Sequence, residues 1–341
     1  MQKNERVVQN ITLLAIETSC DDTSASVIKN GEILSNVVSS QSVHIKYGGV
    51  VPELASRAHQ KNIIPVVNHA LQISKTQLKN IDAIAYTIGP GLLGSLLVGS
   101  SFAKGLAISL NKPLISVNHL EAHVLAPLIE NRNLQFPYLC LLVSGGHTQI
   151  ILVNSITDFE IIGKTIDDAA GEAFDKTAKI IGLPYPGGPL IDKYSQNGNH
   201  DAFKFAIGKV PGLDLSFSGF KTSVLYFIQK QSKKDATFVQ NNLSDICSSI
   251  RKTIITYLMT KLSLAVKQTG INRVSIAGGV AANSLLRNEI IKKTETENWQ
   301  VFIPKLEFCT DNAAMVAFAA YAKMKIEKFS PLDEAPFASF K

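Results

Sequence analysis

Apolar and polar residues follow a recurring order along this chain: short apolar runs end in small polar or glycine-rich turns. The first run, ITLLAI at 11–16, enters a polar turn and leaves through the alternating segment 25–28. The same order returns at 138–153, where YLCLLV leads into SGGHT and then QIILV. Short apolar runs bounded by turn residues are typical of buried strands. Two similar strand, turn, strand units predict an internal duplication.

Two further apolar runs lead into glycine-rich turns and then into helical patterns. The run 81–88 precedes GPGLLGS and an apolar helix that extends to about Leu110, and the run 274–277 precedes GGVAAN and SLLRNEIIKK. Strands that alternate with helices predict an α/β fold with two related halves. Glycine turns at strand ends and helix N-termini suit anions, so these junctions and SGGHT suggest a phosphorylated ligand. Each of them is equally compatible with a tight turn that binds nothing.

The best-known phosphate-binding motifs fit these turns poorly. GPGLLGS matches G-x-G-x-x-G, but a dinucleotide site needs an acidic residue after the next strand. That strand, 114–117, is followed by Asn118 and His119. No Gly-Lys-Ser or Gly-Lys-Thr follows any of the turns, which disfavours a P-loop.

The segment VNHLEAH at 117–123 contains the most specific candidate chemistry. His119 and His123 are four residues apart, so on a helix they share a face and can reach one cation. Metalloprotease helices read H-E-x-x-H, with the catalytic glutamate directly after the first histidine. Here Glu121 is one position later and lies on the far side of the helix, where it is badly placed to be that base. One structural and one solvated histidine is the alternative interpretation.

Composition narrows the class of protein. A chain of 341 residues predicts two lobes, and 45% hydrophobic with 18% charged residues and a mean hydropathy of +0.13 predict a large buried core. The net charge of +6 and pI near 9.0 permit RNA as a partner without requiring it. The four cysteines form no C-x-x-C pair, so neither disulfides nor a zinc ribbon are expected. A polar N-terminus without an apolar signal region, and no membrane-length apolar run, predict a cytoplasmic protein that does not span a membrane.

A series of short motifs runs in order from about 12 to 325. They are AIETSCDDTS (15–24), PELASRAH (52–59), GPGLLGSLLVG (89–99), NHLEAH (118–123), LVSGGHTQ (142–149), IDDAAGEAFDKTAK (166–179), YPGGP (185–189), FSGFKTS (217–223), GGVAANSLLR (278–287) and CTDNAAM (309–315). Together these motifs resemble the TsaD/Gcp family of tRNA threonylcarbamoyltransferases. Ala122 stands where the family usually has glycine, and Asp22 where it more often has glutamate.

The resemblance implies an α/β fold of the actin, Hsp70 and sugar-kinase (ASKHA) kind, with two duplicated RNase-H-like cores and a nucleotide cleft between the lobes. We expect one lobe at 1–130, with the C-terminal helix 311–341 packing back on it, and a second at 131–310. Similarity to the family also implies one divalent metal ion, Fe²⁺ or Zn²⁺, on His119, His123 and Asp311. Without the resemblance, the N-cap of the apolar helix that follows is the favoured interpretation of Asp311.

The resemblance further implies that the adenylate of the substrate lies against residues of the second lobe. Two of these have simpler interpretations: Asp175 fits an exposed ion pair with Lys179, beside the pair of Glu172 with Lys176, and Asn283 fits a helix N-cap. The implied substrate-binding residues are Leu142, Val143, Ser144, Gly145, Gly146, Asp175, Gly188, Asp192 and Asn283.

The implied reaction is attack by N6 of adenosine 37 in tRNAs that read ANN codons on threonylcarbamoyl-AMP, giving t6A and AMP. We assign a catalytic role to Asp21, which would accept a proton from N6 or orient the threonyl group; an Asx turn is the alternative. The implied partners are the tRNA anticodon stem-loop, the paralogous TsaB subunit and the TsaE ATPase, with a homodimer as a further option. Lys204, Lys209 and the QKQSKKD segment at 229–235 are candidates for RNA contact, although such clusters are commonly solvated surface. A metallopeptidase and a nonenzymatic actin-like scaffold are the competing functions.

Overall fold

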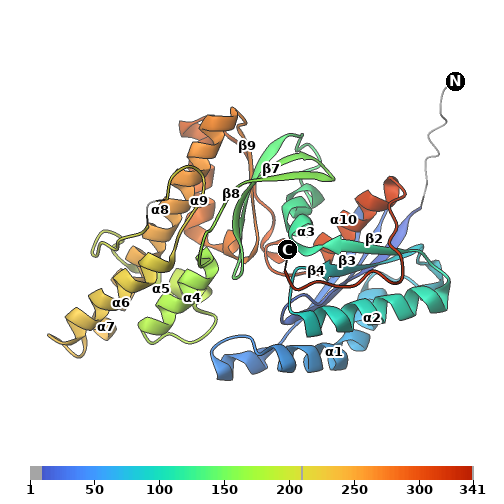
Figure 1. Cartoon of the computed structure of the whole chain (residues 1–341), viewed down its shortest axis with the longest axis horizontal. Coiled ribbons are helices and arrows are strands. Elements are labelled where there is room, and N and C mark those ends of the chain that lie inside the picture. Colours follow the sequence, from blue (N-terminus) through green and yellow to red (C-terminus); the bar gives the residue numbers. More distant parts are fainter. Residues whose placement is uncertain (1–9, 209, 340–341) are drawn as a thin grey trace. The chain divides into compact units, whose positions relative to one another are not determined.

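The chain divides into two compact units, each built around one five-stranded mixed sheet (Figure 1). The computed structural model describes residues 10–208 and 210–339. The first unit contains the chain up to Glu130 together with the segment from Asp311 onward, and the second contains Asn131–Thr310.

The sheet of the first unit has the strand order β3-β2-β1-β4-β5. β2 lies between β1 and β3 and is antiparallel to both. On the other side of β1, β4 and then β5 continue the sheet, each parallel to β1. β1 is buried along its whole length because helices cover both of its faces, as expected of a central strand. The strand bounds are β1 Thr12–Glu17, β2 Asp22–Lys29, β3 Glu32–Ser40, β4 Ala83–Gly89 and β5 Leu114–Asn118.

The sheet of the second unit repeats this order as β8-β7-β6-β9-β10. Its first three strands are again antiparallel neighbours, and β9 and β10 are again parallel to β6. The duplication predicted from the two hairpins, and the α/β class with it, are therefore confirmed. The strand bounds are β6 Tyr138–Val143, β7 Thr148–Ser155, β8 Asp158–Lys164, β9 Arg273–Ala277 and β10 Gln300–Phe302.

Helices of the first unit lie on both faces of its sheet (Figure 1). α1 and α2 pack on each other and on the face where Leu14 and Ile16 meet Ile63, Val66 and Ala103. α10 and α3 cover the opposite face. The helices are α1 Pro52–Ile73, α2 Leu93–Leu110, α3 His119–Leu125 and α10 Ala313–Lys325, with short 3-10 turns at Ser42–Tyr47, Leu78–Asn80 and Ala126–Ile129.

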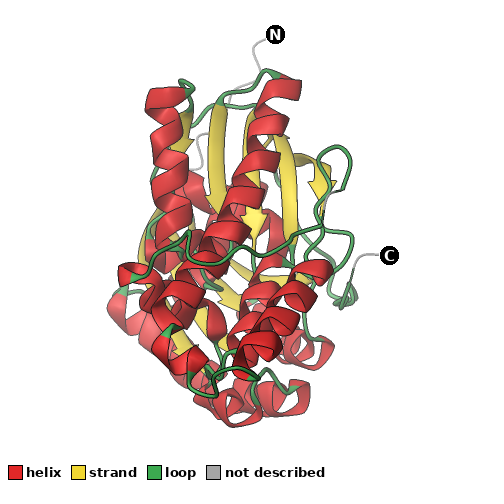
Figure 2. Cartoon of the chain, turned by 90° about the vertical axis from the view of Figure 1, so that its left-hand side faces the viewer, coloured by secondary structure: helices red, strands yellow, loops and turns green. Residues whose placement is uncertain are grey.

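The long α8 of the second unit is largely buried and contacts α4, α5, α7 and α9 (helices are red in Figure 2). Its apolar side chains, Ile250 and Leu258 among them, join Leu139 and Leu141 of β6 in one core. The helices are α4 Ala170–Ile180, α5 Gly187–Tyr194, α6 Ser218–Ser232, α7 Phe238–Asn241, α8 Leu243–Thr269 and α9 Ser284–Thr296, with 3-10 turns at Ser195–Asn197, Gly279–Ala282 and Leu306–Phe308.

α2 is the one helix in the described part of the chain that is long and apolar enough to cross a membrane by length and composition. One third of this stretch, 33%, is buried, and the helix packs on β4 and α1. Leu93, Leu97 and Ile108 are left about half exposed or more. We interpret α2 as a helix that covers the sheet, because its other face is part of the core of the unit.

Candidate functional site

The segment VNHLEAH forms the end of β5 and the start of α3. The Asn118 side chain caps the helix: its Oδ1 accepts hydrogen bonds from the N–H groups of Leu120 at 2.8 Å and Glu121 at 3.2 Å. The helix therefore begins at His119, directly at the carboxyl end of a sheet strand. The helical spacing predicted for the two histidines is confirmed.

His119 and His123 lie together on the buried face of α3. Their ring centroids are 4.7 Å apart, and the residues are 9% and 1% exposed. Glu121 points elsewhere, with its Oε2 3.5 Å from Nζ of Lys323. The predicted phase of Glu121 is thus confirmed, and the base position of a metalloprotease helix is not filled by this residue.

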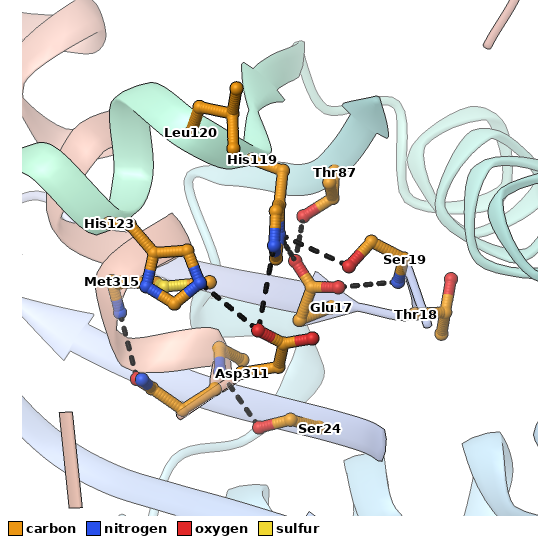
Figure 3. A network of polar contacts seen from close by, with 12 residues as sticks. Glu17, Thr18, Ser19, Ser24, Thr87, His119, Leu120, His123, Asp311 and Met315 are labelled. Carbon is orange, nitrogen blue, oxygen red and sulfur yellow. Dashed lines mark hydrogen bonds and ion pairs between the residues drawn. The ribbon is translucent and has the colours of Figure 1, made fainter. Parts of the chain in front are cut away.

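Asp311 lies opposite the two imidazoles (Figure 3). Its Oδ1 is 3.0 Å from Nε2 of His123 and 3.5 Å from Nε2 of His119. The interpretation of Asp311 as an N-cap is wrong, because Asn312 caps α10 by accepting from the N–H of Met315 at 3.1 Å. With the cap supplied by the next residue, the carboxylate of Asp311 is directed toward the histidines.

Glu17 extends this cluster and was not predicted from the sequence (Figure 3). It is the last residue of β1 and fully buried. Its carboxylate accepts hydrogen bonds from the backbone N–H of Ser19 and the hydroxyl of Thr87, and its Oε2 is 3.2 Å from Nδ1 of His119. The available signal was a charged residue at the end of an otherwise apolar strand, since a buried carboxylate requires polar partners.

The charges of this cluster depend on one another. Burial opposes the charged form of His119, but Asp311 and Glu17 raise its pKa to about 9. Burial likewise opposes ionisation of Glu17, while the His119 charge and hydrogen bond outweigh it and lower the pKa of Glu17. Burial lowers the pKa of His123 despite its hydrogen bond to Asp311. Two carboxylates and two imidazoles thus form a polar cluster inside an apolar unit.

The donor set suits a divalent transition metal. One ligand atom from each of His119, His123 and Asp311 lies within 4.8 Å of the others. Two imidazole nitrogens and one carboxylate oxygen are ligands that Zn²⁺ and Fe²⁺ share, and three protein ligands leave coordination positions open.

Asp21 is half-buried in the turn between β1 and β2 that follows Glu17.

In the second unit, the turn Ser144–Gly146 joins β6 to β7. The N–H of Ser144 donates to the carbonyl of His147 at 2.8 Å, and the N–H of His147 donates to Oγ of Ser144 at 3.1 Å. Gly145 and Gly146 are exposed, and a Cβ at either would meet no atom within 4 Å. Leu142 and Val143 are fully buried in β6, so neither of these two predicted positions presents a side chain to solvent.

Asp175 and Gly188 meet at the N-terminus of α5. Oδ1 of Asp175 accepts from the N–H of Gly187 at 2.7 Å and that of Gly188 at 3.2 Å. Burial raises the pKa of Asp175 even though these two hydrogen bonds favour its ionised form. Asp175 therefore belongs to this turn rather than to the predicted surface pair with Lys179.

Two structural expectations for the second unit are confirmed. The expected ion pair between Glu172 and Lys176 is confirmed at 2.8 Å. Asn283 is confirmed as the N-cap of α9, since its Oδ1 accepts from the N–H groups of Leu285 at 3.1 Å and Leu286 at 3.2 Å.

Asp192 has a buried arginine as its partner, which the sequence did not predict. Nη1 of Arg251 lies 2.7 Å from Oδ1 of Asp192, and the hydroxyl of Ser284 donates to the same oxygen at 2.8 Å. The Arg251 side chain is 10% exposed. This ion pair joins α5, α8 and the start of α9.

Other segments of the same chain occupy the space beside the glycine turn that follows β4. A Cβ on Gly89 would overlap the carbonyl oxygen of Phe337, and one on Gly91 would overlap that of Ser19. The N–H of Leu92 also donates to the carbonyl of Ser19 at 2.7 Å. These glycines are explained by close backbone packing, so their presence does not support the expectation that this junction receives an anion.

The fold matches solved structures that have little sequence identity to this chain. Crystallised HypF, described in a phosphate- and nucleotide-bound form, matches with a TM-score of 0.62 at 16% identity, over 94% of this chain and 47% of that one. Component A of (R)-2-hydroxyglutaryl-CoA dehydratase from Acidaminococcus fermentans matches with a TM-score of 0.54 at 15% identity, over 92% and 98%. At these identities the likeness shows the fold alone, which is the ASKHA-type duplicated α/β architecture expected from the sequence.

Sequence comparison gives the family. Residues 32–318 match the model of TsaD, described as tRNA N6-adenosine threonylcarbamoyltransferase. Relatives of that name from Christiangramia forsetii and Riemerella anatipestifer are 58% and 57% identical, over 94% and 96% of this chain and 96% and 97% of theirs. One from Thermosipho africanus is 50% identical over 95% of this chain and 98% of its own. The chain therefore belongs to the TsaD family of tRNA N6-adenosine threonylcarbamoyltransferases, which confirms the resemblance seen in the motifs.

Proposed function

We propose that this chain transfers the threonylcarbamoyl group from threonylcarbamoyl-AMP to N6 of adenosine 37 in tRNAs that read ANN codons, giving t6A and AMP. Membership of the family supports the reaction. The observation that carries the proposal is the convergence of His119, His123 and Asp311 within one unit, beside the turn that contains Asp21.

Nε2 of His119, Nε2 of His123 and Oδ1 of Asp311 would hold one Fe²⁺ or Zn²⁺ ion. When bound, this ion supplies Lewis-acid stabilisation of negative charge on the carbamoyl oxygen or the departing phosphate. The chain's own contribution is to hold three ligand side chains on a buried helix face and a capped helix start, where their geometry is fixed.

Asp21 is the proposed catalytic residue. It belongs to the turn between β1 and β2, and a carboxylate there can accept the proton that N6 loses or orient the threonyl group by a hydrogen bond. The substrate is a mixed anhydride and is already activated, so positioning of the acceptor and proton removal are the tasks left to side chains.

The second unit is proposed to hold the adenylate, chiefly through the backbone of Ser144–Gly146. Neither a left-handed backbone conformation nor packing requires glycine at Gly145 and Gly146. Exposed glycines of this kind allow a ligand to lie against backbone N–H groups. Gly188, Asp175, Asp192 and Asn283 are proposed to complete this surface.

The proposed partners follow from the family. They are the tRNA anticodon stem-loop, a TsaB subunit and a TsaE ATPase in the cytoplasm, with a homodimer as the alternative assembly. The apolar side chains of Leu93, Leu97 and Ile108 on α2 are about half exposed or more, which suits a protein interface. Lys204 and the lysines near the end of α6, Lys230, Lys233 and Lys234, are candidates for phosphate contact, and the further candidate Lys209 lies outside the described residues.

One assay tests the function. Purified protein with its partner subunits is mixed with labelled threonylcarbamoyl-AMP and tRNA, and label on adenosine is measured for wild type, His119→Ala, His123→Ala and Glu121→Gln. We expect both histidine variants to lose transfer and Glu121→Gln to retain it, because Glu121 faces away from the histidines. Casein cleavage without label transfer would instead support a metallopeptidase.

A further inference from the structure

Glu17 occupies a position that needs a chemical explanation. It is fully buried at the end of an apolar strand, and burial of an ionised carboxylate is costly unless hydrogen bonds compensate for lost water. Leu14 and Ile16 face the core beneath α1 and α2, so Glu17, one residue further, points to the face covered by α3 and α10. The strand register therefore aims this carboxylate at the histidine cluster.

The two ring nitrogens of His119 face different carboxylates. Nδ1 is 3.2 Å from Oε2 of Glu17, and Nε2 is 3.5 Å from Oδ1 of Asp311 (Figure 3). An ionised carboxylate only accepts hydrogen bonds, so Glu17 requires the proton of a neutral imidazole to be on Nδ1. That tautomer leaves the lone pair of Nε2 directed toward Asp311, where the proposed metal would be bound.

Ser19 also contacts His119, but it cannot select one tautomer of the ring. Its hydroxyl is also 3.1 Å from Nδ1 of His119. A hydroxyl can either donate or accept, so Ser19 is compatible with both tautomers of His119. The carboxylate is compatible with one. Selection of the tautomer therefore rests on Glu17 and not on Ser19.

Glu17 is itself held from two sides. The hydroxyl of Thr87 on β4 donates to Oε2, and the backbone N–H of Ser19 donates to Oε1. Both donors are buried, so the carboxylate is fixed before any ligand arrives. By contrast, Nδ1 of His123 is buried and has no hydrogen-bond partner among the described residues. The two proposed metal ligands on α3 thus differ at Nδ1, which contacts Glu17 in His119 and has no hydrogen-bond partner among the described residues in His123.

We propose that Glu17 is a positioning residue for the metal centre: it fixes the Nδ1–H tautomer and the ring orientation of His119, so that Nε2 is presented to the ion. This inference rests on the metal centre of the proposed function. Carboxylates that orient a metal-bound histidine in this way typically contribute about 10- to 100-fold to metal affinity.

The test compares zinc affinity of the full-length chain carrying Glu17→Gln, Ser19→Ala or Thr87→Val with that of wild type, by competition with a chromophoric chelator. Glutamine keeps the shape but cannot accept from all three donors at once. We expect Glu17→Gln to weaken zinc binding by about 10- to 100-fold. We expect a smaller loss for Thr87→Val, which leaves the carboxylate in place, and least for Ser19→Ala. Circular dichroism and melting in chelator confirm that each variant is folded.

The tautomer provides a readout that does not depend on activity. In metal-free protein labelled with ¹⁵N-histidine, at an alkaline pH at which His119 is neutral, the ring is expected to carry its proton on Nδ1 and to lose this preference in Glu17→Gln. If Glu17→Gln does not fold, Glu17→Asp keeps the charge but withdraws it by one methylene, and a smaller loss of affinity is expected.

Each outcome has a separate meaning. Wild-type affinity together with an unchanged His119 tautomer in the folded Glu17 variant would overturn this inference and leave the metal centre intact. Absence of zinc binding by wild type would overturn the metal centre itself.

Discussion

β1 and β6 hold the same position in the two sheets, yet the chain segments that follow them differ in burial and polarity. β1 ends in the buried carboxylate of Glu17, and the turn that follows packs Ser19 against Gly91 and His119. β6 ends in the buried, apolar Val143, and the next turn presents Gly145 and Gly146 to solvent. One duplicated scaffold thus supports a closed, preorganised polar cluster in one unit and an open backbone surface in the other.

The difference shows what an identical topology does and does not determine. The strand order places both turns at the carboxyl ends of central strands, where α/β folds commonly bind ligands. The side chains then decide the chemistry: carboxylates and imidazoles suit a cation, and exposed backbone N–H groups suit an anion. The proposed division into a metal-binding and an adenylate-binding unit follows from this contrast.

The largest effect is expected at the neighbouring residues Asp311 and Asn312. Asp311→Ala removes a proposed metal ligand, so transfer should fall by about two orders of magnitude or more while the melting temperature in chelator stays close to that of wild type. Asn312→Ala removes the N-cap of α10 and should cost about 1 kcal/mol of stability with metal bound as before. Zinc content, transfer rate and chemical denaturation separate the two. Normal zinc content in folded Asp311→Ala would contradict the assignment.

A second prediction places the same substitution in the two glycine turns. Gly91→Ala forces a Cβ against the carbonyl of Ser19 and should lower stability by about 1–3 kcal/mol. Gly145→Ala meets no atom, so the melting temperature should not change, whereas KM for threonylcarbamoyl-AMP should rise by a few fold, about 1 kcal/mol. Equal stability losses in both variants would remove the contrast between a packed and an open turn.

The smallest effect concerns Asp22, at the start of β2 near Asp311 and Glu17. Burial raises its pKa from 3.8 to about 6, despite a hydrogen bond from Ser40. Because the folded chain holds this proton more tightly than the unfolded chain, its contribution to stability is favourable at low pH and is lost as pH rises from 3.8 through 6.

Asp22→Asn removes this cost of ionisation. In chelator at pH 8 the variant should be more stable than wild type by on the order of 1–2 kcal/mol, after allowance for solvent screening. The advantage should disappear at pH 4, where wild-type Asp22 is neutral. Urea denaturation at both pH values measures it, and an advantage that is the same at both would show that ionisation of Asp22 is not the cause.

The sequence predicted most of the fold because its signals are local and repeated. Apolar runs ending in turns identified the strands, and the repetition of one hairpin identified the duplication. The helical phase of His119, His123 and Glu121 was also correct, since it depends only on the spacing of residues within one helix.

Long-range pairing could not be predicted in the same way. Glu17 and His119 are 102 positions apart, and Asp192 and Arg251 are 59 apart. The glycines of GPGLLGS look like phosphate-binding glycines in sequence, but Ser19 and Phe337 fill the space beside Gly91 and Gly89. For Asp311, either of two adjacent polar residues could cap the following helix, and only the structure shows that Asn312 does so.

Anomalous diffraction at the zinc edge, on crystals of the full-length chain grown with zinc, tests the metal centre most directly. We expect one strong peak at about 2.0–2.2 Å from Nε2 of His119, Nε2 of His123 and a carboxylate oxygen of Asp311. A peak away from these three atoms, or none at them in crystals soaked to saturation, would contradict it.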